Sequence, residues 1–127
     1  MIKNFLIIKY IGSDDKLGLR INKEFFIKNL NSKTRGSERL VLDVKEFLNS
    51  NKAKLNENFT VIVNQGPGSF SSIRICFAVA KGLEISKKVK LLGYKNSDLA
   101  VFNKENIEKL IDKKLIEKKL IKPIYLS

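Results

Sequence analysis

A loop rich in glycine is the part of this sequence whose residue types best suit a site for chemistry. It reads Gly66-Pro67-Gly68-Ser69-Phe70 and lies between a β-branched apolar segment and a predicted helix. Backbone N–H groups of such a loop, with the N-terminus of the following helix, favour phosphate and other anions. The loop lacks the Gly-Lys-Ser/Thr ending of a Walker A loop and the third glycine of a dinucleotide fingerprint. We therefore favour the interpretation that it is a structural loop, a tight turn that sets the angle between strand and helix.

Histidine is absent from the sequence, and Cys76 is its one cysteine. Zinc sites and Ser-His or Cys-His catalytic pairs need the residue types that are missing, and a disulfide needs a second cysteine. Helical spacing places Cys76 on the core face of a predicted helix, which indicates a buried small hydrophobe rather than a reactive thiol. We expect no catalytic residue, no metal ligand and no bound cofactor.

The chain is strongly basic: 25 basic and 13 acidic side chains in 127 residues give a net charge of +12. Such a charge would attract nucleic acid or anionic lipid, but a general enrichment in lysine, asparagine and isoleucine explains it more simply. The apolar runs are too short for a membrane span of roughly 20 residues or for a signal peptide. The length fits one domain, and we expect a cytoplasmic protein with no membrane partner.

Apolar periodicity predicts an α/β fold with the element order βββαβαβα. The predicted strands are 5–10, 17–21, 25–27, 59–63 and 91–92, and the predicted helices are 37–51, 73–85 and 105–121. Ser37 is the predicted N-cap of the first helix, Gly93 closes the last strand, and one or two helical turns are expected over 97–102. A slip in apolar phase predicts a break in the last helix near 112–114. These elements predict helices on one or both faces of a mixed five-stranded sheet, the first three strands forming an antiparallel meander.

Two of the predicted helices carry apolar residues away from their buried faces. At about 100° per residue, Ile73 and Phe77 fall outside the apolar arc of their helix, and Leu42 lies opposite the apolar stripe of the earlier one. Exposed apolar residues beside basic ones predict a protein–protein interface with an aromatic anchor and a charged rim. The predicted interface residues are Arg39, Leu42, Ile73, Arg74, Phe77 and Lys81.

The segment from Val63 to Leu83 resembles the GPGSFTGLRIG…A.AKGLA block of the bacterial TsaB (YeaZ) family. That family is related to the glycoprotease (M22-type) proteins and serves tRNA threonylcarbamoyladenosine synthesis. Ser37-Glu38-Arg39-Leu40 is similar to the family's HSERLLPLIDELL helix, and Pro123-Ile124-Tyr125-Leu126 to its terminal P-V-Y-L-R. The resemblance implies a ribonuclease-H-like (actin-like ATPase) lobe.

Family members are longer, so the resemblance implies a minimal form that lacks the second lobe. It implies a single domain, 1–127, made of an actin-like lobe over about 1–102 and a C-terminal helical segment, 104–127. Lys9 stands where the family has the Asp of its I-D-T-S motif, and Gly36 stands where it has a His. The resemblance, with these departures, implies a degenerate nucleotide site and a subunit that is not an enzyme.

The function implied by the resemblance is a noncatalytic scaffold or dimerisation subunit in tRNA threonylcarbamoyladenosine modification. Its implied partners are a TsaD-like catalytic subunit and, as a second candidate, a TsaE-like ATPase, with tRNA contacted indirectly. A homodimer through the two helices is an alternative. The alternative function is a small nucleic-acid-binding protein that uses the Lys-rich C-terminal helix, although few aromatics and four arginines weigh against it.

Overall fold

The structure, a computed structural model, describes residues 3–31 and 36–113. Its elements are β1 (Phe5–Lys9), β2 (Lys16–Ile21), β3 (Glu24–Asn29), α1 (Ser37–Ser50), β4 (Thr60–Gly66), α2 (Phe70–Lys87), β5 (Lys90–Lys95), the short 3-10 helix η1 (Asn96–Asp98) and α3 (Lys104–Asp112). The predicted order of strands and helices is confirmed, and so is the α/β class.

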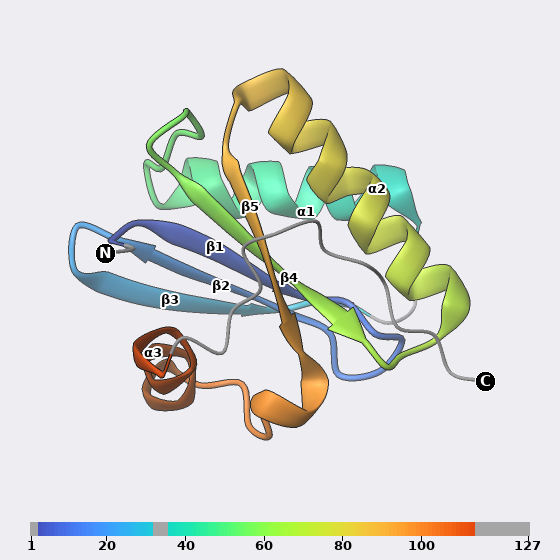
Figure 1. The fold of residues 1–127 in the computed structure, drawn as a ribbon. Helices are drawn as coiled ribbons and strands as arrows, with labels where there is room; N and C mark the ends of the chain where they lie inside the picture. Colours follow the sequence, from blue (N-terminus) through green and yellow to red (C-terminus); the bar gives the residue numbers. More distant parts are fainter. Residues whose placement is uncertain (1–2, 32–35, 114–127) are drawn as a thin grey trace.

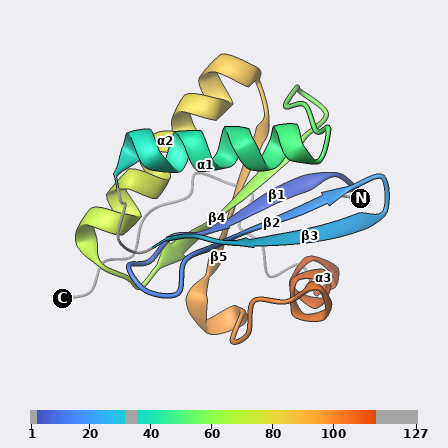
Figure 2. The same cartoon turned by 180° about the vertical axis from the view of Figure 1, so that it is seen from behind.

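A five-stranded sheet with the order β3-β2-β1-β4-β5 forms the middle layer. β1, β2 and β3 pair antiparallel as a meander, whereas β4 pairs in parallel with β1 and with β5. Figure 1 shows α1 and α2 on one face of the sheet and α3 on the other, and the view from behind in Figure 2 agrees. An antiparallel meander joined to two parallel strands is the arrangement that the resemblance to a ribonuclease-H-like, actin-like lobe implies.

Two hydrophobic clusters lie on opposite faces of the sheet because side chains alternate along each strand. On β1, Leu6 and Ile8 belong to the larger cluster under α1 and α2, whereas Phe5 and Ile7 belong to the smaller one under α3. Both faces are covered, which explains why this strand reads as one continuous apolar run. At Gly18 of β2, an added Cβ would lie 2.8 Å from Cγ2 of Ile7, so a larger residue there would force side chains of the smaller cluster to move.

Two local expectations are wrong. Gly36, not Ser37, is the N-cap of α1: its φ is 127°, a conformation that favours glycine, and Ser37 is the first helical residue. Gly93 does not close the last strand, because β5 continues to Lys95. An added Cβ at Gly93 would lie 2.9 Å from the side chain of Gln65, so this glycine allows close packing inside the sheet.

Helix ends differ from the sequence pattern at other points. α2 begins at Phe70, three residues before the predicted start, because the side chain of Ser69 accepts a hydrogen bond from the N–H of Ser72 and caps the helix. α3 ends at Asp112, within the predicted break, and the predicted helix beyond 113 lies outside the described residues. Over 97–102 the structure has one 3-10 turn, η1. None of the helices in the described ranges is long and apolar enough to cross a bilayer.

Candidate functional site

A groove of about 890 Å³ lies between α1 and α2. Its lining comes from both helices and from the loop after α1: Ser37, Val41, Val44, Lys45, Leu48, Asn49, Ala53, Lys54, Leu55, Ala78, Val79, Gly82, Leu83, Ser86 and Lys87. The lining is mostly apolar, and it includes three lysines. Among the residues that the structure describes, no aspartate or glutamate lines the groove.

Small side chains on α2 leave this groove open. Ala78, Gly82 and Ser86 repeat every four residues, so they lie along one flank of the helix. An added Cβ at Gly82 would meet no described atom within 4 Å. On the facing helix, Val41 is 38% exposed, so the wall opposite this flank is apolar and accessible.

Ile73, which the sequence places among the exposed interface residues, is fully buried at 0% exposure, so that prediction is wrong. The first turn of α2 packs against the loop that follows β1, where the N–H of Ser69 donates to the carbonyl oxygen of Ile11 over 2.8 Å. The buried stripe of α2 includes Ile73, whereas Ile75 is only half-buried.

Three other predicted interface residues of α2 lie outside the groove lining. Phe77 is half-buried and packs against the cluster under α1 and α2. The guanidinium carbon of Arg74 lies 5.1 Å from the ring centroid of Phe70, and Nζ of Lys81 lies 3.6 Å from Oε1 of Glu84. Arg74 continues the four-residue row of Ala78, Gly82 and Ser86 towards the start of α2, before the groove begins, whereas Phe77 and Lys81 lie to one side of this row.

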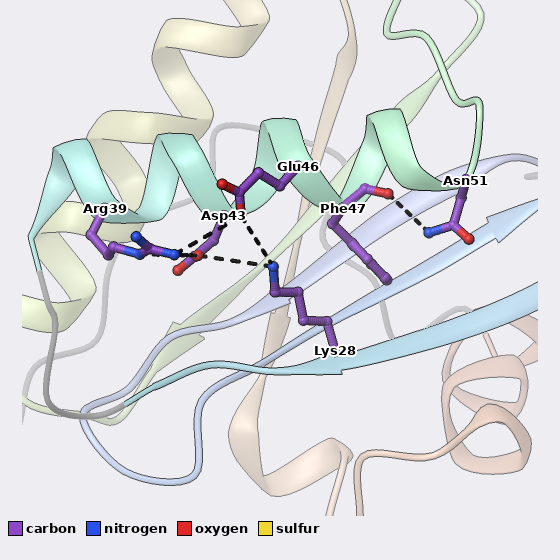
Figure 3. A network of polar contacts seen from close by, with 6 residues as sticks. All are labelled: Lys28, Arg39, Asp43, Glu46, Phe47 and Asn51. Atoms are coloured by element: carbon purple, nitrogen blue, oxygen red, sulfur yellow. Dashed lines mark hydrogen bonds and ion pairs between the residues drawn. The ribbon is translucent and has the colours of Figure 1, made fainter.

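On α1, Arg39 belongs to an internal network of charges (Figure 3). Its Nη2 donates to Oδ1 of the buried Asp43 over 2.7 Å and its Nε over 3.1 Å. Nζ of Lys28, on β3, lies 4.0 Å from the same oxygen and 3.7 Å from Oε2 of Glu46. The hydrogen bond and charge of Asp43 raise the pKa of Arg39. The network ties α1 to the edge of the sheet.

Leu42 keeps its predicted exposure, with 44% of its surface accessible. It lies on the outer side of α1, where it lines a shallow hollow with Val41 and Lys45. Val41 and Lys45 also line the groove, so this hollow adjoins the groove along α1. Leu42 is therefore the predicted interface residue that lies beside the groove.

The Gly66 loop makes the contacts of a tight turn. Gly66 has a φ of 110°, and an added Cβ at Gly68 would lie 2.8 Å from Cβ of Ile11. The side-chain amide of Asn96 donates to the carbonyl oxygen of Pro67, and Ser69 caps α2. The glycines thus let the turn pass close to the loop after β1.

Where β1 ends, Lys9 takes part in an ion pair. Its Nζ lies 3.6 Å from Oδ2 of Asp14, whose other oxygen lies 3.1 Å from Nζ of Lys16. The hydrogen bond and charge of Lys16, and then the charge of Lys9, lower the pKa of Asp14. In the described ranges, no three His, Cys, Asp or Glu side chains are grouped so that they could hold a metal ion. Cys76 is fully buried, as predicted, and burial raises the pKa of its thiol.

A family model described as "TsaD: tRNA N6-adenosine threonylcarbamoyltransferase" matches residues 32–113. The chain belongs to this family. Within it, the chain resembles the TsaB (YeaZ) proteins. The tRNA threonylcarbamoyladenosine biosynthesis protein TsaB of Buchnera aphidicola subsp. Acyrthosiphon pisum is 29% identical over 110 residues, which are 85% of this chain and 49% of that protein. The TsaB of the subspecies Baizongia pistaciae is 37% identical over 59 residues, 45% of this chain and 27% of that protein.

Solved structures give the same fold. YeaZ from Pseudomonas aeruginosa superposes with a TM-score of 0.68 at 18% identity, covering 89% of this chain and 50% of YeaZ. A second structure, described as an uncharacterized protein similar to the peptidase YeaZ from the same organism, gives the same values. The chain therefore spans about half the length, or less, of the TsaB and YeaZ proteins that it matches.

Proposed function

We propose that this chain is a noncatalytic, TsaB-like subunit in tRNA threonylcarbamoyladenosine biosynthesis that supports a TsaD-like catalytic partner. The observation that carries the proposal is the apolar groove between α1 and α2, together with the TsaB names of the curated relatives. Val41 and Leu83 offer apolar surface in the groove, and Leu42 offers it in the hollow beside the groove. Water contact with such a surface is unfavourable, and a partner helix that fills the groove would remove it.

The end of β1 supports a noncatalytic role. The resemblance places an acidic residue at position 9, but this chain has the ammonium of Lys9, which is held by Asp14. The thiol of Cys76 is buried and kept protonated, so it is no nucleophile at neutral pH. Both observations favour a subunit that leaves the chemistry on tRNA to its partner. From the resemblance we further propose that tRNA is contacted indirectly.

The nucleic-acid alternative gains little from the described part of the Lys-rich segment. Between 104 and 113, Lys104, Lys109 and Lys113 are balanced by Glu105, Glu108 and Asp112. Nζ of Lys104 lies 3.8 Å from Oε1 of Glu108, so part of this charge is neutralised within α3. The remaining lysines of the segment lie outside the described residues.

The proposal is tested by filling the groove. Gly82→Leu places a side chain in the open space and, because leucine favours helix more than glycine does, leaves α2 intact. Lys81→Leu is the matched control, since it adds the same side chain one position away, at a residue that does not line the groove. Light scattering after gel filtration should show a complex of the wild type with the TsaD of the same organism.

We expect Gly82→Leu to weaken this complex at least about tenfold and Lys81→Leu to change it less than about twofold. A wild-type chain that forms no complex with TsaD would contradict the proposal. Loss of the complex in Lys81→Leu or Phe77→Ala, with Gly82→Leu unaffected, would instead place the partner on the Phe77 flank of α2.

A further inference from the structure

The groove between α1 and α2 carries charge of one sign. Lys45 on α1, Lys54 on the following loop and Lys87 at the end of α2 are all exposed at its edges. The ion pairs recorded on these helices lie elsewhere: Glu46 pairs with Lys28 and Arg39, and Glu84 pairs with Lys81. Within the described ranges, no ion pair involves any of the three lysines.

We infer that the groove selects a protein partner whose docking surface is an apolar helix face flanked by aspartate or glutamate. This inference rests on the proposed function and adds the chemistry of the partner to it. The accessible apolar floor and walls of the groove, with Val41, Leu55 and Leu83, are exposed or half-buried, and apolar side chains of a partner would cover them. Carboxylates at the margins would neutralise the three lysines, and such complementarity sets specificity and association rate more than affinity.

The short side chains that line α2 also suit a helix as the occupant of the groove. Ala78, Gly82 and Ser86 form a flank with short side chains, so the backbone of a third helix can approach α2 closely. Val41 and Leu83 then border the helix on either side. The partner element is accordingly a helix with apolar residues at i, i+3 or i+4 and i+7, and with acidic residues beside them.

Other occupants fit the charges less well. A second copy of this chain would bring the same lysines to a two-fold interface, between chains that each carry a net charge of +12. Residues 114–127 of the chain hold four lysines and one glutamate, so they repeat the sign of the rim. A nucleic acid would pair with the lysines but would leave the apolar floor uncovered.

The test reverses the charges of the rim. The groove variant combines Lys45→Glu, Lys54→Glu and Lys87→Glu, and the control variant combines Lys23→Glu, Lys95→Glu and Lys109→Glu. Both triple variants change the formal charge by −6, and all six lysines are exposed. Circular dichroism spectra and the thermal unfolding midpoint, Tm, should show that both triple variants remain folded. Binding to the TsaD of the same organism is then measured by surface plasmon resonance at about 50 mM and about 500 mM salt.

We expect the groove variant to bind TsaD at least about 30-fold more weakly than the wild type at low salt, mainly through slower association. The control variant should stay within about threefold, and the difference between the two should shrink at high salt because ions screen exposed charges. Equal effects of the two variants, with the wild type binding tightly, would overturn the inference but leave the proposed function standing. A wild type that does not bind TsaD would overturn the proposed function and the inference with it.

The other occupants are distinguished in the same samples. A wild-type dimer in light scattering that Gly82→Leu converts to monomer would show that a second copy fills the groove. Lysine-specific cross-links in the isolated full chain from Lys87 to Lys118 or Lys119 would assign the groove to the chain's own C-terminal residues. Binding of total tRNA that the groove variant loses and the control retains, without any effect on TsaD binding, would assign it to nucleic acid. Each of these results would overturn the inference.

Discussion

The N–H of Tyr10 donates to Oδ1 of Asn64 over 2.6 Å, which joins the residue after β1 to the neighbouring parallel strand β4. Asn64 is fully buried, and the thiol of Cys76 on α2 lies 3.9 Å from the same oxygen. One amide side chain therefore connects two strands and a helix at the carboxyl end of the sheet. A buried N–H group that loses its acceptor is costly, so this contact holds the turn after β1 in place.

Asn64→Leu should lower the free energy of unfolding by about 1 to 3 kcal/mol, because the buried N–H of Tyr10 loses its acceptor. Urea titration followed by dichroism measures the change. Asn58→Leu is the matched control: Asn58 is exposed in the loop before β4, and its replacement should stay within about 0.5 kcal/mol. Equal effects at the two positions would show that the Tyr10 contact contributes nothing.

Ile73→Ala should cost about 2 to 5 kcal/mol of stability, the range for a truncated core side chain, since Ile73 is fully buried. Leu42→Ala, at a position 44% exposed, should cost less than about 1 kcal/mol. Binding to TsaD, measured below the Tm of each variant, should be weakened by Leu42→Ala. An Ile73→Ala variant that is as stable as the wild type but does not bind TsaD would show that Ile73 belongs to the interface.

The fold could be predicted largely from the sequence because its strongest signals are local. The continuous apolar run over β1 and the turns around β2 and β3 predict the meander without knowledge of distant contacts. The ends of the helices were predicted less accurately. Ser37 has a side chain typical of an N-cap, but Gly36, with a φ of 127°, is the residue that caps α1. Which residue caps a helix depends on the backbone conformation of the residues that precede it, and the local sequence pattern does not determine that conformation.

The candidate site was harder to predict because it depends on how two helices lie against each other. A helical wheel treats the sheet as the only surface that buries a residue. It therefore missed the burial of Ile73, in the first turn of α2, where the chain also packs against the loop after β1 through the hydrogen bond from Ser69 to Ile11. The groove itself needs the relative position of α1 and α2. Its available signal was the repeat of Ala78, Gly82 and Ser86 at four-residue spacing, which marks a flank with little side-chain volume.

Cys76 should not react with thiol reagents while the chain is folded. Its side chain is fully buried, and burial, followed by the nearby charge of Asp15, raises the pKa of the thiol. At pH 8, Ellman's reagent should label the native chain at least about 100-fold more slowly than the chain in concentrated urea, because the thiolate is the reactive form. Equal rates in the two states would mean that the interior of α2 opens readily.

Asp14 should contribute stability that depends on pH. Its pKa is held below the usual 3.8, first by Lys16 and then by Lys9, so the folded chain favours the carboxylate. A lowered pKa stabilises the fold above the unfolded value, and this stabilisation is lost as the pH falls through the folded value. The Tm of Asp14→Asn should therefore lie below that of the wild type at pH 7, and the difference should shrink as the pH falls below the usual pKa of 3.8. A constant difference in Tm across this range would show that the carboxylate itself is not responsible.

Gly82→Ala and Gly36→Ala should change stability in opposite directions, although an added Cβ meets no described atom within 4 Å at either position. Gly82 has ordinary helical backbone geometry, so alanine should raise the free energy of unfolding by up to about 1 kcal/mol through its higher helix propensity. Gly36 has a φ of 127°, which an L side chain rarely adopts, so alanine there should lower it by about 1 kcal/mol or more. Urea titrations of the two variants measure both effects. A loss of stability in Gly82→Ala would mean that the space beside α2 is filled in the isolated chain.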